Sequence, residues 1–270
     1  MTATDIETGT SEPRQWWASL LLAMGWLICL LPYVLAGTWQ SIHLLQSPEE
    51  AASSSEPSDQ ILWWIVTAVV AGWAVLLARA TEWAAPQVRA RAICAAGATY
   101  TLAIVVGVLV LVPWLDDLGW LRSYPAESLP IWMGVGEAVS AGVGEELVVL
   151  ALGVAVLAGV SQRRWWPVAA LTILVAARLS YHLYYGWGVL WLVPWAIVAA
   201  ALAWFIRSWW VIVVFAVVHT AYDIIAFCAH DVQPYAVALG LVAVATLVWA
   251  GWDVRQERHT ARTATAATVA

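Results

Sequence analysis

The chain has 270 residues, of which 63% are hydrophobic and only 11% are charged, and its mean hydropathy is +0.78. This composition excludes an ordinary soluble domain, in which about 25% of residues are charged, and a disordered chain, which has few apolar residues. The net charge of −6 says little about partners, because the charges of such a chain are divided between the two sides of a membrane. We expect a polytopic membrane protein.

The first apolar segment follows a polar N-terminal tail, residues 1–17. This tail holds three acidic residues and a single Arg14, so it lacks the basic region of a secretory signal. We therefore expect the first helix, predicted over 18–38, to be retained. A stretch rich in Ser, Glu and Pro follows, and its composition predicts a loop over about 39–60.

Seven further apolar segments follow this loop. Each is close to the ~20 residues that a helix needs to cross a ~30 Å hydrocarbon core. They run over about 61–78, 92–114, 137–160, 167–185, 188–206, 208–229 and 233–252. The prediction is an all-α bundle of eight transmembrane helices over residues 18–252, followed by a tail over 253–270.

The arginines predict the orientation of the bundle, because cytoplasmic loops carry an excess of basic residues. With a cytoplasmic N-terminus, ten of the twelve arginines lie in inner segments, one lies in an outer loop, and Arg178 lies within a helix. Both termini are then cytoplasmic. The chain has no lysine and is rich in Ala, Val, Gly and Trp, which indicates a GC-rich bacterial gene. We expect a multi-pass protein of the bacterial plasma membrane.

Two adjacent carboxylates, Glu145 and Glu146, interrupt the fourth apolar segment. A charged side chain in the middle of a bilayer costs about 2.5 to 3.5 kcal/mol on insertion scales, so such residues usually face the bundle interior and mark chemistry or transport. Neighbouring carboxylates out of water suit a general base and a proton carrier equally. These two residues are therefore the first candidates for a functional site.

Two further pairs of polar residues lie in later apolar segments. Arg178 and His182 are four residues apart, and so are His219 and Asp223, so within a helix the members of each pair share one face. Three helices can thus bring six polar side chains together. In lipid, such side chains are costly to bury unless they pair with one another. At a rise of about 1.5 Å per residue, they are predicted to meet in the outer half of the membrane.

The order of these residues resembles the CAAX protease and bacteriocin-processing (CPBP, or Abi) family of intramembrane proteases, which includes the Ras-converting CAAX endopeptidases. That family carries a Glu-Glu-x-x-x-Arg motif, a Phe-x-x-x-His motif and a His-x-x-x-Asn or His-x-x-x-Asp motif within an eight-helix core. The glutamate pair, then His182, then His219 with Asp223 match these motifs in order. The resemblance covers about residues 131–230.

Two positions depart from the family pattern. Leu150 stands where the first motif has arginine, and Arg178 stands where the second has phenylalanine. An arginine at position 150 would lie one turn from Glu146 and compensate one of the two carboxylates, which leucine cannot do. Arg178 lies deep in its helix, one turn from His182, and we predict that it supplies the missing charge.

The resemblance implies an intramembrane endopeptidase that hydrolyses a peptide bond of a membrane-associated protein or peptide without a cofactor. It assigns Glu145 and His182 to holding and deprotonating a water molecule. It assigns His219 and Asp223 to stabilising the oxyanion, although Asp223 could instead orient the imidazole. Glu146 would give electrostatic support.

Three other functions stay open. Glu145, His182 and His219 match the ligand set of a catalytic zinc ion, with Asp223 behind them, so the same hydrolysis could depend on zinc. The same side chains could relay protons in a proton-coupled transporter. The leucine at the arginine position also fits an inactive family member. The expected partners are a membrane peptide and the lipid bilayer, with no nucleic acid.

Overall fold

The computed structural model describes residues 31–46, 57–80, 88–121, 130–160, 164–229 and 231–269, and five positions between 20 and 28. Within these residues the secondary structure is helical throughout, and no strand occurs. The α-helices are α2 (Leu31–Gln46), α4 (Pro57–Ala80), α5 (Ala90–Val106), α6 (Val112–Asp117), α7 (Ile131–Val143), α8 (Gly153–Val160), α9 (Trp166–Ser180), α10 (Val193–Ile206), α11 (Trp209–Cys228) and α12 (Gln233–Val269). The π-helical segments η2 (Gly107–Leu111) and η3 (Gly144–Leu152) and the 3-10 segment η4 (Leu183–Leu192) connect some of them.

Five helical runs are long and apolar enough to cross a membrane: Ala90–Asp117, Ile131–Ala158, Leu183–Ile206, Trp209–Cys228 and Gln233–Glu257. Two shorter helical runs, Ile61–Leu76 and Trp166–Ser180, are also apolar. Large apolar side chains on several of these helices are exposed on the outside, among them Val69, Phe205 and Leu241. The predicted class, an all-helical protein with several apolar helices that could cross a membrane, is confirmed.

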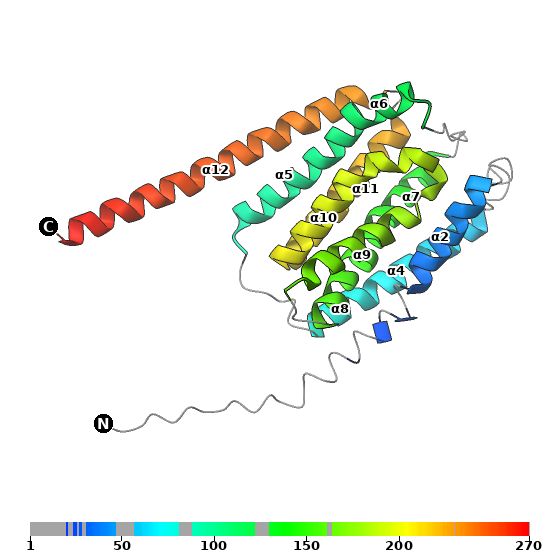
Figure 1. The fold of residues 1–270 in the computed structure, drawn as a ribbon, viewed down its shortest axis with the longest axis horizontal. Coiled ribbons are helices and arrows are strands. Elements are labelled where there is room, and N and C mark those ends of the chain that lie inside the picture. Colours follow the sequence, from blue (N-terminus) through cyan, green and yellow to red (C-terminus); the bar gives the residue numbers. More distant parts are fainter. Residues whose placement is uncertain are drawn as a thin grey trace.

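The helices lie side by side in a bundle (Figure 1). Helix α12 packs along α5 on one flank and extends past the bundle, and α2 and α4 lie on the opposite flank. Helix α7 packs against α11 in between. Segment η3, which continues α7 and carries the two glutamates, contacts α4, α9, α10 and α11, so it lies in the interior of the bundle.

Aromatic side chains form a large part of the core beside η3. The rings of Tyr100 and Phe215 are fully buried and stack with their centres 4.2 Å apart. Trp195 meets Tyr100 edge-on, with a distance of 5.9 Å between ring centres. Because these rings are large and rigid, they fix α5, α10 and α11 against one another around the polar residues.

The predicted loop over 39–60 is wrong at its beginning, because α2 continues as a helix to Gln46. Its polar side chains are used in packing. Thr38 Oγ1 donates a hydrogen bond to Ser180 Oγ over 2.7 Å, and Ser41 Oγ accepts one from the backbone N–H of Tyr184 over 2.7 Å. The Ser41 contact stabilises the helix where composition predicted a loop. Residues 47–56, and most of the first predicted helix before residue 31, lie outside the described residues.

Helix α9 ends at Ser180, earlier than the predicted end at 185, so Arg178 and His182 do not share a helix face. The imidazole itself explains this end. His182 Nδ1 lies 2.9 Å from the carbonyl oxygen of Arg178, and since a carbonyl only accepts, the ring nitrogen donates to a carbonyl of the last helical turn. Gly186 then adopts a positive φ of 61°, which favours glycine, inside η4.

Helix α12 runs to Val269, well beyond its predicted end at 252. Ion pairs with the start of α5 hold this extension. The Arg91 guanidinium lies 3.0 Å from an Asp253 carboxylate oxygen and 2.5 Å from one of Glu257. The polar tail therefore begins as a continuation of the last apolar helix.

Gly142 allows α7 to approach α11 closely. A Cβ atom at this position would collide with Thr220 Oγ1 and lie 2.9 Å from both the Ala216 carbonyl oxygen and the Thr220 nitrogen. Because two of these atoms belong to the backbone, no side-chain rotation could relieve the contact. Gly142, three residues before Glu145, thus sets the distance between α11 and the helical run that continues into the two glutamates.

We expect Gly142→Ala to lower the midpoint of thermal unfolding in detergent, followed by tryptophan fluorescence, because overpacking a close contact typically costs about 1–3 kcal/mol. Gly72→Ala in α4 is the matched control, since nothing lies within 4 Å of a Cβ atom there. Alanine in this helix should be neutral or stabilising. Equal midpoints for the two variants would contradict the close packing of α7 on α11.

Candidate active site

The two glutamates project from the π-helical segment η3. Such segments are rare in proteins overall, but many of those that occur lie at functional sites, because their wider turns change which side chains share a face. Glu145 is 6% exposed and Glu146 is completely buried. The two glutamates are adjacent in the sequence but have different surroundings.

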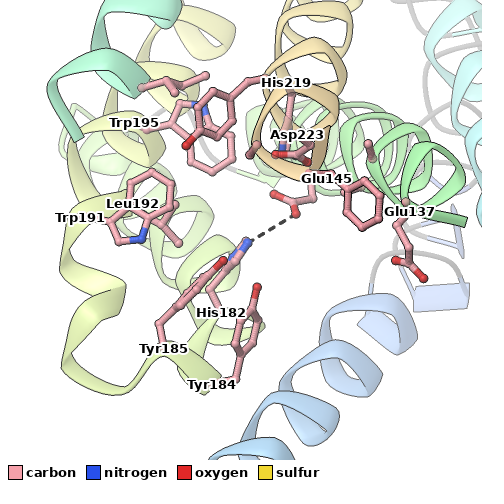
Figure 2. Close-up of a pocket in the computed structure, with 17 residues that line it drawn as sticks. Glu137, Glu145, His182, Tyr184, Tyr185, Trp191, Leu192, Trp195, His219 and Asp223 are labelled. Atoms are coloured by element: carbon pink, nitrogen blue, oxygen red, sulfur yellow. Dashed lines mark ion pairs between the residues drawn. The ribbon is translucent and has the colours of Figure 1, made fainter. Parts of the chain in front are cut away.

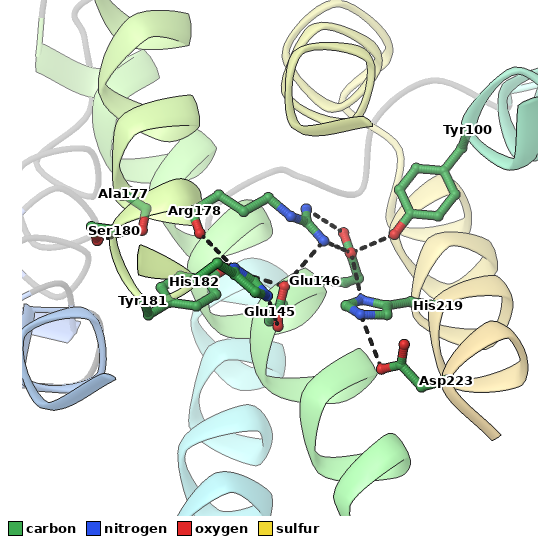
Figure 3. Close-up of polar contacts among 10 residues, drawn as sticks. All are labelled: Tyr100, Glu145, Glu146, Ala177, Arg178, Ser180, Tyr181, His182, His219 and Asp223. Carbon is green, nitrogen blue, oxygen red and sulfur yellow. Dashed lines mark hydrogen bonds and ion pairs between the residues drawn. The ribbon is translucent and has the colours of Figure 1, made fainter. Parts of the chain in front are cut away.

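Glu146 is bound by donors from three other helices (Figure 3). Its Oε1 accepts hydrogen bonds from the Tyr100 hydroxyl over 2.6 Å and from His219 Nδ1 over 3.1 Å. The Arg178 guanidinium binds both carboxylate oxygens, with Nη1 3.2 Å from Oε2 and Nη2 against Oε1. This bidentate pair is a strong, directional interaction.

Arg178 is buried and supplies the charge that Leu150 cannot, as predicted. Its guanidinium carbon lies 3.9 Å from the ring centre of Trp195, a cation–π contact, and its Nη2 also lies 3.4 Å from Glu145 Oε2. Leu150 packs into the apolar core. The positive charge beside Glu146 thus comes from α9 and not from position 150 on η3.

The two oxygens of Glu145 face different partners. Oε2 accepts a hydrogen bond from the Tyr181 hydroxyl over 3.2 Å and is the oxygen nearest to Arg178. Oε1 lies 3.5 Å from His182 Nε2. Since His182 Nδ1 donates to a backbone carbonyl, the neutral ring turns the lone pair of Nε2 towards Glu145. Oε2 is thus held by a hydrogen bond, and Oε1 faces the imidazole nitrogen across 3.5 Å.

His219 lies between two carboxylates. Its Nδ1 is 3.1 Å from Glu146 Oε1, and its Nε2 is 3.2 Å from Asp223 Oδ2. A neutral imidazole has only one N–H, so two ionised carboxylates are both satisfied only when the ring carries two protons. The contact between His219 Nε2 and Asp223 is the one that the predicted orienting role of Asp223 requires.

A cavity of about 440 Å³ adjoins the site (Figure 2). Four of the six predicted residues line it: Glu145, His182, His219 and Asp223. Glu146 and Arg178 are not among the lining residues. The structure therefore brings all six predicted residues together but divides them into four that reach the cavity and two that lie behind it.

Sequence reasoning missed several residues of the site. The cavity also contains Glu137 and a group of aromatic side chains, Tyr184, Tyr185, Trp191, Trp195, Tyr222 and Phe227. Tyr100 and Tyr181 each bind one of the two glutamates. The position of Tyr181 beside His182 was a usable signal, whereas Tyr100 lies outside the family-like region and is one aromatic residue among many.

The three residues of the predicted alternative zinc site, Glu145, His182 and His219, all line the cavity. Both ring nitrogens of His219 lie close to carboxylates in this arrangement. In the part of the chain that the structure describes, no group of three or more His, Cys, Asp or Glu side chains could hold a metal ion.

Comparisons of the chain with protein-family models, with curated proteins and with solved structures find no match. The likeness to the CPBP family therefore rests on the motifs alone. The function has to be argued from the contacts, burial and charges of this site.

We expect Arg178→Phe to lower the free energy of unfolding by roughly 3 to 5 kcal/mol, because it leaves the buried Glu146 carboxylate without its cation. Urea unfolding in detergent measures the change. Adding Glu146→Gln should restore a large part of the loss, since the amide carries no charge. Arg255→Phe, at an exposed position of α12, is the matched control. Equal stability of the two arginine variants would contradict the role assigned to the ion pair.

Proposed function

We propose that the protein is an intramembrane endopeptidase of the CPBP type, which hydrolyses a peptide bond of a membrane-associated protein or peptide. The observation that carries the proposal is the Glu145–His182 pair at the cavity wall, 3.5 Å apart, beside the second carboxylate–imidazole pair of Asp223 and His219. Hydrolysis without a covalent intermediate needs an activated water and stabilisation of the oxyanion. The two pairs match these two needs.

Glu145 and His182 would activate the water. Glu145 Oε1 and the unprotonated Nε2 of His182 are both acceptors, so a water between them would donate one hydrogen bond to each and turn its oxygen lone pairs to the cavity. As the water oxygen attacks the carbonyl carbon, Glu145 would take its proton and then pass a proton to the leaving amine. Tyr181 would hold the second carboxylate oxygen throughout.

His219 would stabilise the oxyanion. Its Nε2 lies on the side of Asp223, which lines the cavity, and its Nδ1 lies on the side of the buried Glu146. A doubly protonated ring held between two carboxylates would bring positive charge to the cavity wall, and its Nε2–H would turn from Asp223 to the oxyanion as the negative charge develops. Asp223 would orient this ring.

Glu146 would support the reaction without touching the substrate. It is completely buried, bound by three side chains and absent from the cavity lining. We therefore propose that Glu146 and Arg178 position His219 and Glu145. The reacting roles belong to the residues that reach the cavity.

The arginine distribution supports eight transmembrane helices with both termini in the cytoplasm. The cavity is lined by residues from the start of α7, Gly134 and Glu137, and from the end of α11, Ala226 and Phe227. In this orientation, both helix ends lie on the outer side. The site would then serve peptides that enter from the outer half of the membrane.

The test is cleavage of a library of membrane-inserted peptides by the full chain in proteoliposomes. Glu145→Gln and His182→Ala should each reduce turnover by about 10²- to 10⁴-fold or more, the contribution typical of acid–base groups. The control variant Asp116→Asn, which removes an exposed carboxylate of α6, should keep the turnover of the unchanged protein.

A chelator is expected to leave the rate unchanged. A loss that zinc reverses would favour the zinc-dependent version of the reaction. Near-normal turnover by Glu145→Gln or His182→Ala would overturn the assignment, and a proton current without cleavage would favour a transporter.

The proposed orientation has its own test in intact cells. In a background without the native cysteines, cysteines placed at Ser53 and Val232 should react with an impermeant thiol reagent, because both loops are predicted outside. Cysteines at Ser161 and Thr265 should react only after the cells are opened. Labelling of this second pair in intact cells would reverse the orientation and the side of the cavity.

A further inference from the structure

Glu137 is a cavity residue to which the proposed reaction gives no role. It lies on the continuous helical run Ile131–Ala158, eight residues before Glu145, and its side chain is half-buried at the cavity. Figure 2 shows it on the same helical run as Glu145, at the edge of the cavity. Among the described residues, no hydrogen bond or ion pair joins Glu137 to another side chain.

The cavity has more negative than positive charge. Three carboxylates line it, Glu137, Glu145 and Asp223, and no arginine is among the described lining residues. The chain has no lysine. Arg178 is bound to the buried carboxylate behind the wall. Even with His219 fully protonated, the lining keeps a negative balance, and Glu137 is the carboxylate without a counter-charge.

The remaining wall suits the stem and head of a long cationic side chain. Tyr185, Trp191 and Tyr222 line the cavity together with Glu137. Aromatic faces attract ammonium and guanidinium groups, and they pack against the methylene stems of lysine and arginine. A carboxylate in a cavity whose lining also contains aromatic rings can bind a basic side chain, whereas a free C-terminal carboxylate would be repelled.

We propose that Glu137 is a specificity residue that binds a lysine or arginine side chain of the peptide substrate, about three or four residues from the bond that is cut. The inference rests on the proposed endopeptidase function. Eight helical residues separate Glu137 from Glu145 by roughly 12 Å along the axis. An extended peptide advances about 3.3 Å per residue, so this separation corresponds to three or four residues.

The first test uses a peptide that the reconstituted full chain cuts, synthesised with a single Lys, Gln or Glu at each of the six positions on either side of the cleaved bond. Lys at the third or fourth position on one side should raise kcat/KM about tenfold over Gln at the same position, the effect of one partly buried ion pair. Glu at that position should lower it.

Glu137 variants show whether this residue reads the charge. In Glu137→Gln the ratio of the rates for the Lys and Gln peptides should fall to about one, and in Glu137→Arg the Glu peptide should become the better substrate. Asp116→Asn should keep the original ratio. A merely structural role of Glu137 would lower all the rates together and could not invert the preference.

The second test measures binding without cleavage. The probe is the acetylated and amidated peptide Leu-Leu-Ala-Lys-Ala-Leu-Leu, compared with its Gln counterpart, and the protein is the full-length Glu145→Gln variant. The blocked termini leave the lysine as the only cation. The Lys peptide should bind about tenfold more tightly, and the difference should disappear when Glu137→Gln is added.

The outcomes separate this inference from the proposed function. Cleavage with equal rates and equal binding for Lys and Gln peptides would overturn the inference and leave the endopeptidase in place. Binding that prefers the Lys peptide through Glu137, without cleavage of any library peptide, would overturn the endopeptidase and leave Glu137 as a cation-binding residue. Equal binding without cleavage would overturn both.

Discussion

The buried ion pair of Glu146 and Arg178 is the interaction on which the site depends. A carboxylate inside an apolar bundle is costly unless a cation and hydrogen-bond donors surround it. Arg178 comes from α9, and Tyr100 and His219 bring donors from α5 and α11. The contacts of Glu146 thus hold four helical elements together at one point. Because Glu146 makes these contacts, the neighbouring Glu145 can present one oxygen to the cavity.

The class of the fold and most of the polar centre could be predicted because both depend on features that are rare in a sequence. Apolar runs near 20 residues leave few structures other than membrane helices. Ionisable residues within such runs are few, so Glu145, His182 and His219 stood out, and the missing motif arginine directed attention to Arg178. The cost of an unpaired charge in lipid was enough to predict that Arg178 pairs with one of the two glutamates.

What could not be predicted depends on contacts between distant segments. Helix α9 stops where a side chain of the site binds its last turn, and α2 continues because Ser41 meets the backbone of Tyr184. Tyr100 is one of 29 aromatic side chains other than phenylalanine, and only the fold shows that its hydroxyl reaches a glutamate. Glu137, near the start of its apolar run, has the sequence position of an ordinary interfacial residue.

The side chain and the backbone of Arg178 each bind a different residue of the site, and this has a consequence for the assembly of the protein in the membrane. Its guanidinium binds Glu146 and its carbonyl oxygen fixes the ring of His182, so the counter-charge and the imidazole arrive together when the last turn of α9 docks. A partly assembled bundle would contain neither a compensated glutamate nor an oriented histidine. The proposed endopeptidase would therefore be able to hydrolyse peptides only once its helices are in place, which would protect the cell from cleavage by a half-folded form.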